Sequence, residues 1–247
     1  MSEDDKSQLD GKPKYRRVLL KLSGEIFGGE NKFGFDPESF KKIASQIIEA
    51  YNLNIQISIV VGAGNIIRGQ MGEKMGIDRA TADYMGMLGT VINSLLLQEI
   101  IEQSGYACRV MSAIHIPAVC EPYIRRRAIR HLEKGRIVIF AGGTGNPYFS
   151  TDTCATLRAS EIKADVVLKA TKVDGIYDSD PMVNKLATKF DSITYSQFLS
   201  MQLKVMDATA VALCMERKIP IIVFNIYQEG NLKNVLIGKK VGTLLHP

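Results

Sequence analysis

Short apolar runs alternate with amphipathic stretches along most of this chain. The apolar runs are rich in Val, Ile and Leu and predict buried strands at residues 18–22, 55–61, 106–111, 137–140, 166–168, 219–224 and about 242–245. Between them, apolar residues recur every three or four positions and predict helices at residues 36–51, 78–104, 123–133, 152–162 and 205–217. The first helix has a further signal, since Asp36 and Pro37 are typical of a helix N-terminus.

The alternation predicts an α/β fold. Strands that are apolar throughout and separated by helices form mainly parallel sheets covered on both faces. We therefore expect a three-layer αβα sandwich around a mainly parallel sheet. The 247 residues contain no internal repeat or low-complexity linker and fit one domain at residues 15–247, behind a loose polar tail at residues 1–14. The polar stretch around Pro147 predicts a boundary between an N-terminal lobe of about residues 15–150 and a C-terminal lobe of about 151–247.

Composition argues against several classes of protein. The chain has 31 Lys and Arg against 26 Asp and Glu, a formal net charge of +5, and only 7% aromatic residues with no Trp, which gives little sign of a nucleic-acid-binding surface. No apolar run approaches the roughly 20 residues of a membrane span. The acidic N-terminus lacks the pattern of a secretion signal. We therefore expect no membrane partner, a cytoplasmic location, and four free thiols at the widely spaced cysteines.

One basic segment departs from this balanced composition. It comprises Arg125, Arg126, Arg127, Arg130 and His131 within a helical pattern. A solvated helix face accounts for such a run, and an anion site or a subunit contact is the alternative.

Residues suited to ligand binding cluster in the loops that follow the strands, which is where ligands bind in parallel sheets. Four loops carry glycine, hydroxyl or basic residues: Lys21–Gly24, Gly62–Arg68, Ala141–Pro147 leading into Thr151–Thr153, and Lys169–Tyr177 leading into Asp180–Pro181. Glycine lets backbone amides approach an anion, and helix N-termini add partial positive charge. With Lys21, Arg68 and Lys169 at one edge, the loops predict a phosphate site. Mg²⁺ would add charge there, and Asp152 would orient lysines or a metal-bound water.

Several common motifs are missing from the sequence. Gly238–Lys240 lacks the first glycine and the Ser or Thr of a P-loop, and Ile67 takes the place of the third glycine of a dinucleotide fingerprint. No G-x-S-x-G or H-E-x-x-H motif is present. The sequence thus excludes a P-loop kinase and argues against a dinucleotide-binding enzyme or a common hydrolase.

A set of motifs distributed over nearly the whole chain is more specific. The motifs are Lys21–Gly24, Gly64–Asn65 with Arg68–Gly69, Asp83–Leu88, Met111–Ile114, Gly143–Pro147, Asp165–Gly175 and Leu203–Asp207. Together, from about Tyr15 to Leu245, they closely resemble the amino acid kinase family, and within it the bacterial branch that phosphorylates UMP. The resemblance implies the amino acid kinase fold and phosphoryl transfer from Mg-ATP to UMP, giving UDP and ADP.

The same resemblance implies roles for individual residues. Catalytic roles fall to Lys21, Arg68, Asp152 and Lys169, and no residue is assigned to Mg²⁺. ATP contacts are implied at Lys21, Leu22, Ser23, Gly24, Gly64, Arg68, Thr171, Tyr177 and Asp180, on the C-terminal lobe's side. UMP contacts are implied at Ala63, Asp83, Thr144, Gly145, Asn146, Pro147, Tyr148, Phe149, Ser150 and Thr151, on the N-terminal lobe's side. Asp83 matches the residue that holds the UMP ribose.

Regulation and assembly are also implied by the resemblance. Family members of this branch are typically homohexamers activated by GTP and inhibited by UTP. The stretch Gly29, Glu30, Asn31, Lys32, Phe33 and Gly34 matches a segment linked with the GTP response. Two departures stand out: Ala63 replaces a UMP-contacting glycine, which is tolerable at negative φ, and the arginine run is more basic than expected.

Two alternatives to UMP phosphorylation remain at this stage. A relative that phosphorylates a carboxylate or carbamate would share the ATP half but lack a ribose-directed Asp83 and the Thr144–Thr151 pocket. A non-catalytic nucleotide- or oxyanion-binding assembly would not need Lys21, Asp152 and Lys169 intact.

Overall fold

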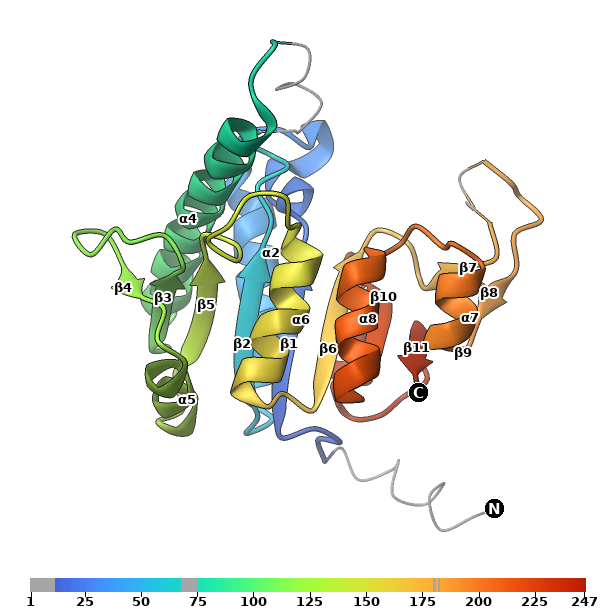
Figure 1. Ribbon diagram of the computed structural model, residues 1–247. Helices are drawn as coiled ribbons and strands as arrows, with labels where there is room; N and C mark the ends of the chain where they lie inside the picture. Colours follow the sequence, from blue (N-terminus) through green and yellow to red (C-terminus); the bar gives the residue numbers. More distant parts are fainter. Residues whose placement is uncertain (1–11, 68–74, 180, 182) are drawn as a thin grey trace.

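The computed structural model describes residues 12–67, 75–179, 181 and 183–247. A nine-stranded sheet forms its centre, in the order β4-β3-β5-β2-β1-β6-β10-β11-β9 (Figure 1). The strands are β1 (Arg17–Leu22), β2 (Gln56–Val61), β3 (Cys108–Ser112), β4 (Glu121–Pro122), β5 (Ile137–Ala141), β6 (Val166–Thr171), β9 (Ser192–Thr194), β10 (Ile221–Asn225) and β11 (Thr243–His246). All neighbours in this sheet pair in parallel except β10 and β11. The predicted mainly parallel sheet is confirmed.

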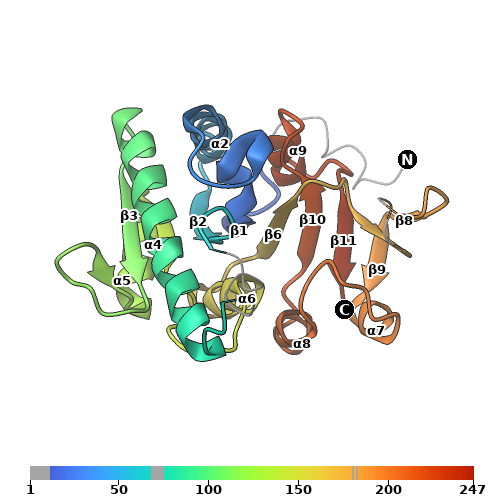
Figure 2. The same cartoon turned by 90° about the horizontal axis from the view of Figure 1, so that it is seen from above.

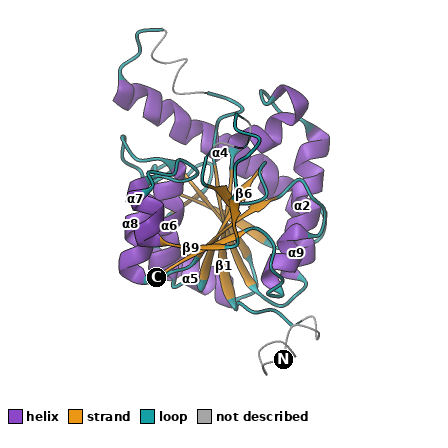
Figure 3. Ribbon diagram, turned by 90° about the vertical axis from the view of Figure 1, so that its right-hand side faces the viewer, coloured by secondary structure: helices purple, strands orange, loops and turns teal. Residues whose placement is uncertain are grey.

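Helices cover both faces of the sheet (Figures 2 and 3). One face carries α2 (Pro37–Tyr51), α4 (Arg79–Gln103) and α9 (Asn231–Leu236), and the other carries α5 (Arg125–Glu133), α6 (Thr151–Ile162), α7 (Tyr195–Ser200) and α8 (Ala208–Arg217). Side chains of a strand point alternately to its two faces. Accordingly, Leu20 packs in the core that contains Phe40 of α2, while Leu19 packs in the core that contains Cys154 of α6. The αβα sandwich expected from the sequence is therefore confirmed.

Short elements are the ones that the sequence pattern did not predict. They include α7 and α9, the strands β4 and β9, the separate hairpin of β7 (Ile176–Tyr177) and β8 (Lys189–Phe190), and the 3₁₀ segment η2 (Gly24–Asn31). None of the missed α-helices or strands exceeds six residues, so each is too short for a clear period of 3.6 or 2 to emerge. The helix predicted from residue 205 begins instead at Ala208, because Asp207 is its N-cap residue.

Of the predicted tail at residues 1–14, residues 1–11 lie outside the described part of the chain. Its last residue is already held, since the Lys14 backbone amide donates to the Leu236 carbonyl at 2.8 Å. The division into two lobes stays a prediction.

Helix α4 is long and apolar enough to cross a membrane by length and composition, the only described helix with this property. The expectation of no membrane partner stays a prediction. In the structure Val91, Leu97 and Ile101 of this helix are buried in the core, and the core helices of soluble proteins commonly pass the same test.

Candidate active site

Strand register brings two lysines together in the middle of the sheet. β1 pairs with β6 so that Lys21 lies directly opposite Lys169. Residues in register on parallel strands point to the same face, and both lysines share a face with Leu19 and Val167, under α6. Their exposed fractions are 8% and 7%. Two ammonium groups are thus buried side by side.

Asp152 lies between these lysines, in the first turn of α6. Its Oδ1 is 2.7 Å from the Lys21 Nζ, and its Oδ2 accepts a hydrogen bond from the Lys169 Nζ. The turn itself is fixed by Ser150, the N-cap residue, whose Oγ accepts from the backbone amide of Asp152 at 3.0 Å. The positive end of the α6 dipole also favours a carboxylate at this position. Asp152 therefore contacts both lysines, and its predicted role of orienting them stays a prediction.

The environment of this cluster shifts the pKa values of Asp152 and Lys169. Burial would raise the pKa of Asp152, but Lys21 and Lys169 together hold it below its usual value. Burial and the neighbouring Lys21 lower the pKa of Lys169 to about 8, against the opposing attraction of Asp152. Two cations and one anion in a poorly solvated place form a site suited to an anionic ligand.

The lysine cluster opens into a cleft at the carboxyl ends of β1 and β6. The cleft has a volume of about 260 Å³, and its lining includes Lys21, Ser23, Lys169 and Thr171, all predicted ATP-side or catalytic residues. A pocket of about 610 Å³ adjoins it through shared lining residues and contains Tyr177. The Tyr177 hydroxyl donates to Asp174 Oδ1 at 2.6 Å. The cleft and this pocket thus bring together four of the nine predicted ATP contacts.

Three other predicted ATP residues can offer a ligand only their backbone. Leu22 is buried in the core that contains Phe40, so only its backbone can face a ligand. Gly24 and Gly64 lie backbone against backbone, and a Cβ on Gly24 would be 2.4 Å from the Gly64 amide nitrogen. Arg68 and Asp180 fall outside the described residues, so their predicted roles stay predictions.

The predicted UMP residues come together across a long sequence separation. The backbone amide of Tyr148 donates to Asp83 Oδ2 at 2.7 Å, which joins the loop after β5 to the second turn of α4. Arg79 also contacts Asp83, with its Nε 3.0 Å from Oδ1. Within the loop, the Thr144 hydroxyl accepts from the Asn146 amide and donates to the Asn146 carbonyl, closing a turn. The segment Thr144–Thr151 is thus joined to Asp83 through the Tyr148 amide.

Asp207 is a residue of this site to which sequence reasoning gave no role. Its Oδ2 accepts hydrogen bonds from the hydroxyls of Ser150 and Thr153, the latter at 3.2 Å. It also lines a pocket of about 390 Å³ together with Asp152. The signal that could have found it is its position, since an Asp directly before an amphipathic pattern is typical of a helix N-cap.

The sequence pattern of the amino acid kinase family matches residues 16–225. The chain belongs to this family. A solved UMP kinase structure from Bacillus anthracis is 41% identical, with a TM-score of 0.92 over 94% of this chain and 96% of that one. A UMP kinase from Ureaplasma parvum is 36% identical, with a TM-score of 0.89 over 95% and 100% of the two chains. A uridylate kinase from Archaeoglobus fulgidus is 27% identical, with a TM-score of 0.70 over 92% and 99%.

The family match makes the segment from Gly29 to Gly34 of interest, because the family resemblance implies a link between this segment and a GTP response. It lies beside the candidate site: Gly34 and Asn65 exchange two hydrogen bonds, of 2.7 Å from the Gly34 amide and 2.8 Å from the Asn65 Nδ2. Lys32 lines the same cleft as Lys21 and Lys169. The segment is therefore attached to the loop after β2, and the GTP response itself stays a prediction.

Ala63, which replaces a glycine of the family, is accommodated in the structure. Its φ lies outside the left-handed region, where only glycine is comfortable. Its methyl group is directed at Gly89 of α4, where an added Cβ would lie 2.8 Å away. The condition set from the sequence, a negative φ, is met.

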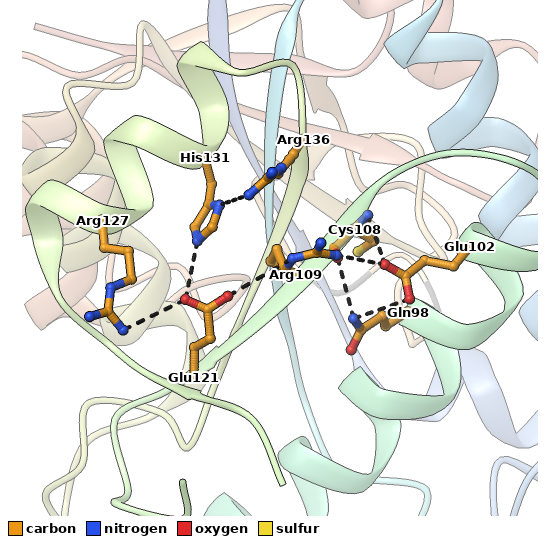
Figure 4. Close-up of polar contacts among 8 residues, drawn as sticks. All are labelled: Gln98, Glu102, Cys108, Arg109, Glu121, Arg127, His131 and Arg136. Atoms are coloured by element: carbon orange, nitrogen blue, oxygen red, sulfur yellow. Dashed lines mark hydrogen bonds and ion pairs between the residues drawn. The ribbon is translucent and has the colours of Figure 1, made fainter. Parts of the chain in front are cut away.

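The arginine run lies on the exposed side of α5 and partly in an intramolecular network (Figure 4). Glu121 accepts from the buried His131, at 3.2 Å between Nε2 and Oε2, and lies 3.7 Å from Arg127. Arg136 Nη1 lies 3.0 Å from His131 Nδ1, so the ring is held between Arg136 and Glu121. His131 is thus a structural residue, while Arg125, Arg126 and Arg130 remain exposed.

The described carboxylates of the site were compared with the donor set of a metal centre by their contacts. Both oxygens of Asp152 are engaged by lysines. Among the described residues there is no group of three His, Cys, Asp or Glu side chains close enough to share an ion. Mg²⁺ is commonly bound through substrate phosphates with few protein ligands, so this donor set fits a metal that arrives with a nucleotide.

Proposed function

We propose that the protein transfers the γ-phosphoryl group of ATP to UMP, forming UDP and ADP, a step of pyrimidine nucleotide biosynthesis. The observation that carries the proposal is the Lys21–Asp152–Lys169 cluster at the edge where the predicted nucleotide-binding loops meet. The likeness to UMP kinases at 41% and 36% identity over nearly the whole chain supports the choice of UMP.

In this mechanism the protein positions and neutralises charge and performs little covalent chemistry. A phosphate oxygen of UMP attacks the γ-phosphorus of ATP in line, and ADP leaves. Lys21 and Lys169, held by Asp152, neutralise charge on the transferred group, together with Arg68 and backbone amides of the glycine loops. No general base is needed, because the second pKa of a phosphate monoester is about 6.

The two nucleotides occupy opposite sides of the lysine cluster in this proposal. UMP lies on the side of Asp83 and Thr144–Thr151, where Asp83 would exchange its contacts with Arg79 and Tyr148 for the ribose. ATP lies along the cleft of Thr171 and the pocket of Tyr177. The N-terminal lobe would therefore hold the acceptor and the C-terminal lobe the donor.

Further properties are proposed from the family resemblance. Mg²⁺ enters as part of the co-substrate Mg-ATP, consistent with the engaged oxygens of Asp152. The enzyme is a cytoplasmic homohexamer, activated by GTP through the Gly29–Gly34 segment and inhibited by UTP.

A coupled ADP-release assay tests the function. The protein is incubated with Mg-ATP and, in parallel, with UMP, CMP, dUMP, acetylglutamate or carbamate. We expect turnover with UMP well above the others. Preference for acetylglutamate or carbamate would replace the proposal with a carboxylate or carbamate kinase. Binding of ATP and UMP in calorimetry without turnover would replace it with a binding protein.

A further inference from the structure

The middle of α4 contacts two of the glycine loops that border the candidate site. The Asn93 Nδ2 donates to the Gly62 carbonyl at 2.8 Å, and the Gly142 amide donates to the Thr90 hydroxyl at 2.9 Å. Asn93 and Thr90 are 0% and 3% exposed. These contacts make α4 the element against which the loops after β2 and β5 are placed.

A further contact between the loop after β2 and α4 is the one between the Ala63 methyl group and Gly89. A Cβ built on Gly89 would lie 2.8 Å from the Cβ of Ala63, whereas ordinary contacts of this type are 3.4–4 Å. Ala63 therefore occupies the space that a side chain on Gly89 would need. Ala63 itself is only 8% exposed, so its methyl group is buried where the loop after β2 faces α4.

A displacement of Ala63 would reach the loop after β1 directly. A Cβ on Gly24 would lie 2.4 Å from the Gly64 nitrogen and 2.8 Å from the backbone of Ala63, and the Gly62 amide donates to the Leu22 carbonyl at 2.9 Å. The two loops meet through backbone atoms, which cannot rotate away as a side chain can. Lys21 lies three residues before Gly24.

We propose that Gly89 is a positioning residue for phosphoryl transfer and that Ala63 is its matched partner. Among the described atoms nearest to a Cβ on Gly89, those of Ala63 and Ile66, only Ala63 belongs to a proposed substrate contact. Gly89 acts by letting the Gly62–Asn65 loop rest against α4 at the correct distance. The inference rests on the proposed function. It gives the alanine at position 63 a physical reason, since the glycine at position 89 makes room for it.

Four variants test the pair: Gly89→Ala, Ala63→Gly, the double variant Ala63→Gly/Gly89→Ala, and Gly86→Ala. Gly86 is the matched control for helix stability, because it lies in the same helix and a Cβ there meets nothing within 4 Å. For each variant, kcat and the KM values for UMP and ATP are measured, together with thermal unfolding. Since a misplacement of about 1 Å can cost about 100-fold in rate, we expect Gly89→Ala to lower kcat at least about tenfold.

The double variant separates positioning from general damage. It moves the methyl group from position 63 to position 89, so the total side-chain volume of the pair is that of the parent. We therefore expect kcat within about threefold of the parent value. If Gly89→Ala is too unstable to assay, the double variant must still fold and recover kcat. Parent-like kcat in Gly89→Ala, a loss that follows only the melting temperature, or failure of the double variant to recover would each overturn the proposal.

A failure of the proposed function would look different. A parent protein that binds ATP but does not phosphorylate UMP would contradict the function alone. The pair is then tested by ATP affinity in calorimetry, which must fall in Gly89→Ala and return in the double variant. Unchanged affinity in Gly89→Ala would overturn the positioning role in that case.

Discussion

Lys169 should make phosphoryl transfer sensitive to pH above neutrality. Burial and the adjacent Lys21 lower its pKa from 10.5 to about 8. Only the protonated ammonium neutralises charge on a phosphate, so we expect kcat/KM for ATP to fall as pH rises through 8. At pH 9 only about one molecule in ten would keep the proton, a loss of about tenfold in kcat/KM. In kcat the decline should move to higher pH, because bound phosphates favour the charged ammonium.

The stability of the fold should change in the opposite direction over the same range. Between about pH 8 and 10.5 the unfolded chain keeps the Lys169 proton while the folded chain has released it. The unfolded state then binds more protons, so the free energy of unfolding rises with pH. The gap between 10.5 and about 8 corresponds to about 3 kcal/mol at about 1.4 kcal/mol per pKa unit. This destabilisation is fully present at neutral pH and is relieved at alkaline pH.

Lys169→Arg isolates both effects, because a guanidinium stays charged throughout. The assay records kcat/KM for ATP from pH 6.5 to about 10 at saturating UMP, whose own phosphate titrates near pH 6. Urea unfolding at matched pH values gives the stability of parent and variant. Lys134→Arg, at an exposed position that lines neither the cleft nor the adjoining pocket, is the control for a lysine-to-arginine change. A decline near pH 8 that persists in Lys169→Arg, or a parent-minus-variant stability that does not rise above pH 8, would refute the reasoning.

Three further predictions concern the ligand contacts and the helix cap. Lys21→Ala should lower kcat by about 100-fold or more, as loss of one preorganised donor does, while urea unfolding still shows a cooperative fold; an unchanged kcat contradicts its role. Asp83→Ala should chiefly raise the KM for UMP in steady-state kinetics, and an effect confined to ATP contradicts that assignment. Asp207→Ala should lower the free energy of unfolding by about 1 kcal/mol, because the hydroxyls of Ser150 and Thr153 lose their acceptor; Asp207→Asn, which keeps an acceptor, should lose less, and equal losses would contradict this explanation.

The layers of the fold were predictable because each central strand and each long helix carries its own pattern. The order of the strands was not, since periodicity says which face of a strand is buried but not which strand lies beside it. Lys21 and Lys169 illustrate the difference. Their positions at strand ends predicted the same edge of the sheet, but direct opposition depends on the register of β1 with β6.

The candidate site shows the same limit at the level of single contacts. Motif resemblance predicted Asp83 and the Thr144–Thr151 segment as one pocket, and the hydrogen bond from the Tyr148 amide joins them. The contact between Ala63 and Gly89 has no sequence signal, because a glycine in a helix is locally unfavourable and its reason lies in another element. Asp207 had a local signal as an N-cap residue, but its contacts with α6 depend on how two helices pack.

The geometry of the lysine cluster explains why a carboxylate belongs between two groups that must bind phosphate. Without Asp152, two buried ammonium groups on adjacent strands would repel each other, and Lys169 would release its proton more readily. Asp152 contacts each lysine with one of its carboxylate oxygens, which leaves the cluster with one net positive charge. The N-terminus of α6 adds a partial positive charge. Buried ionic groups of this kind commonly destabilise a fold relative to apolar residues of similar volume. The cluster is therefore better explained by the anion it receives than by the stability of the sheet.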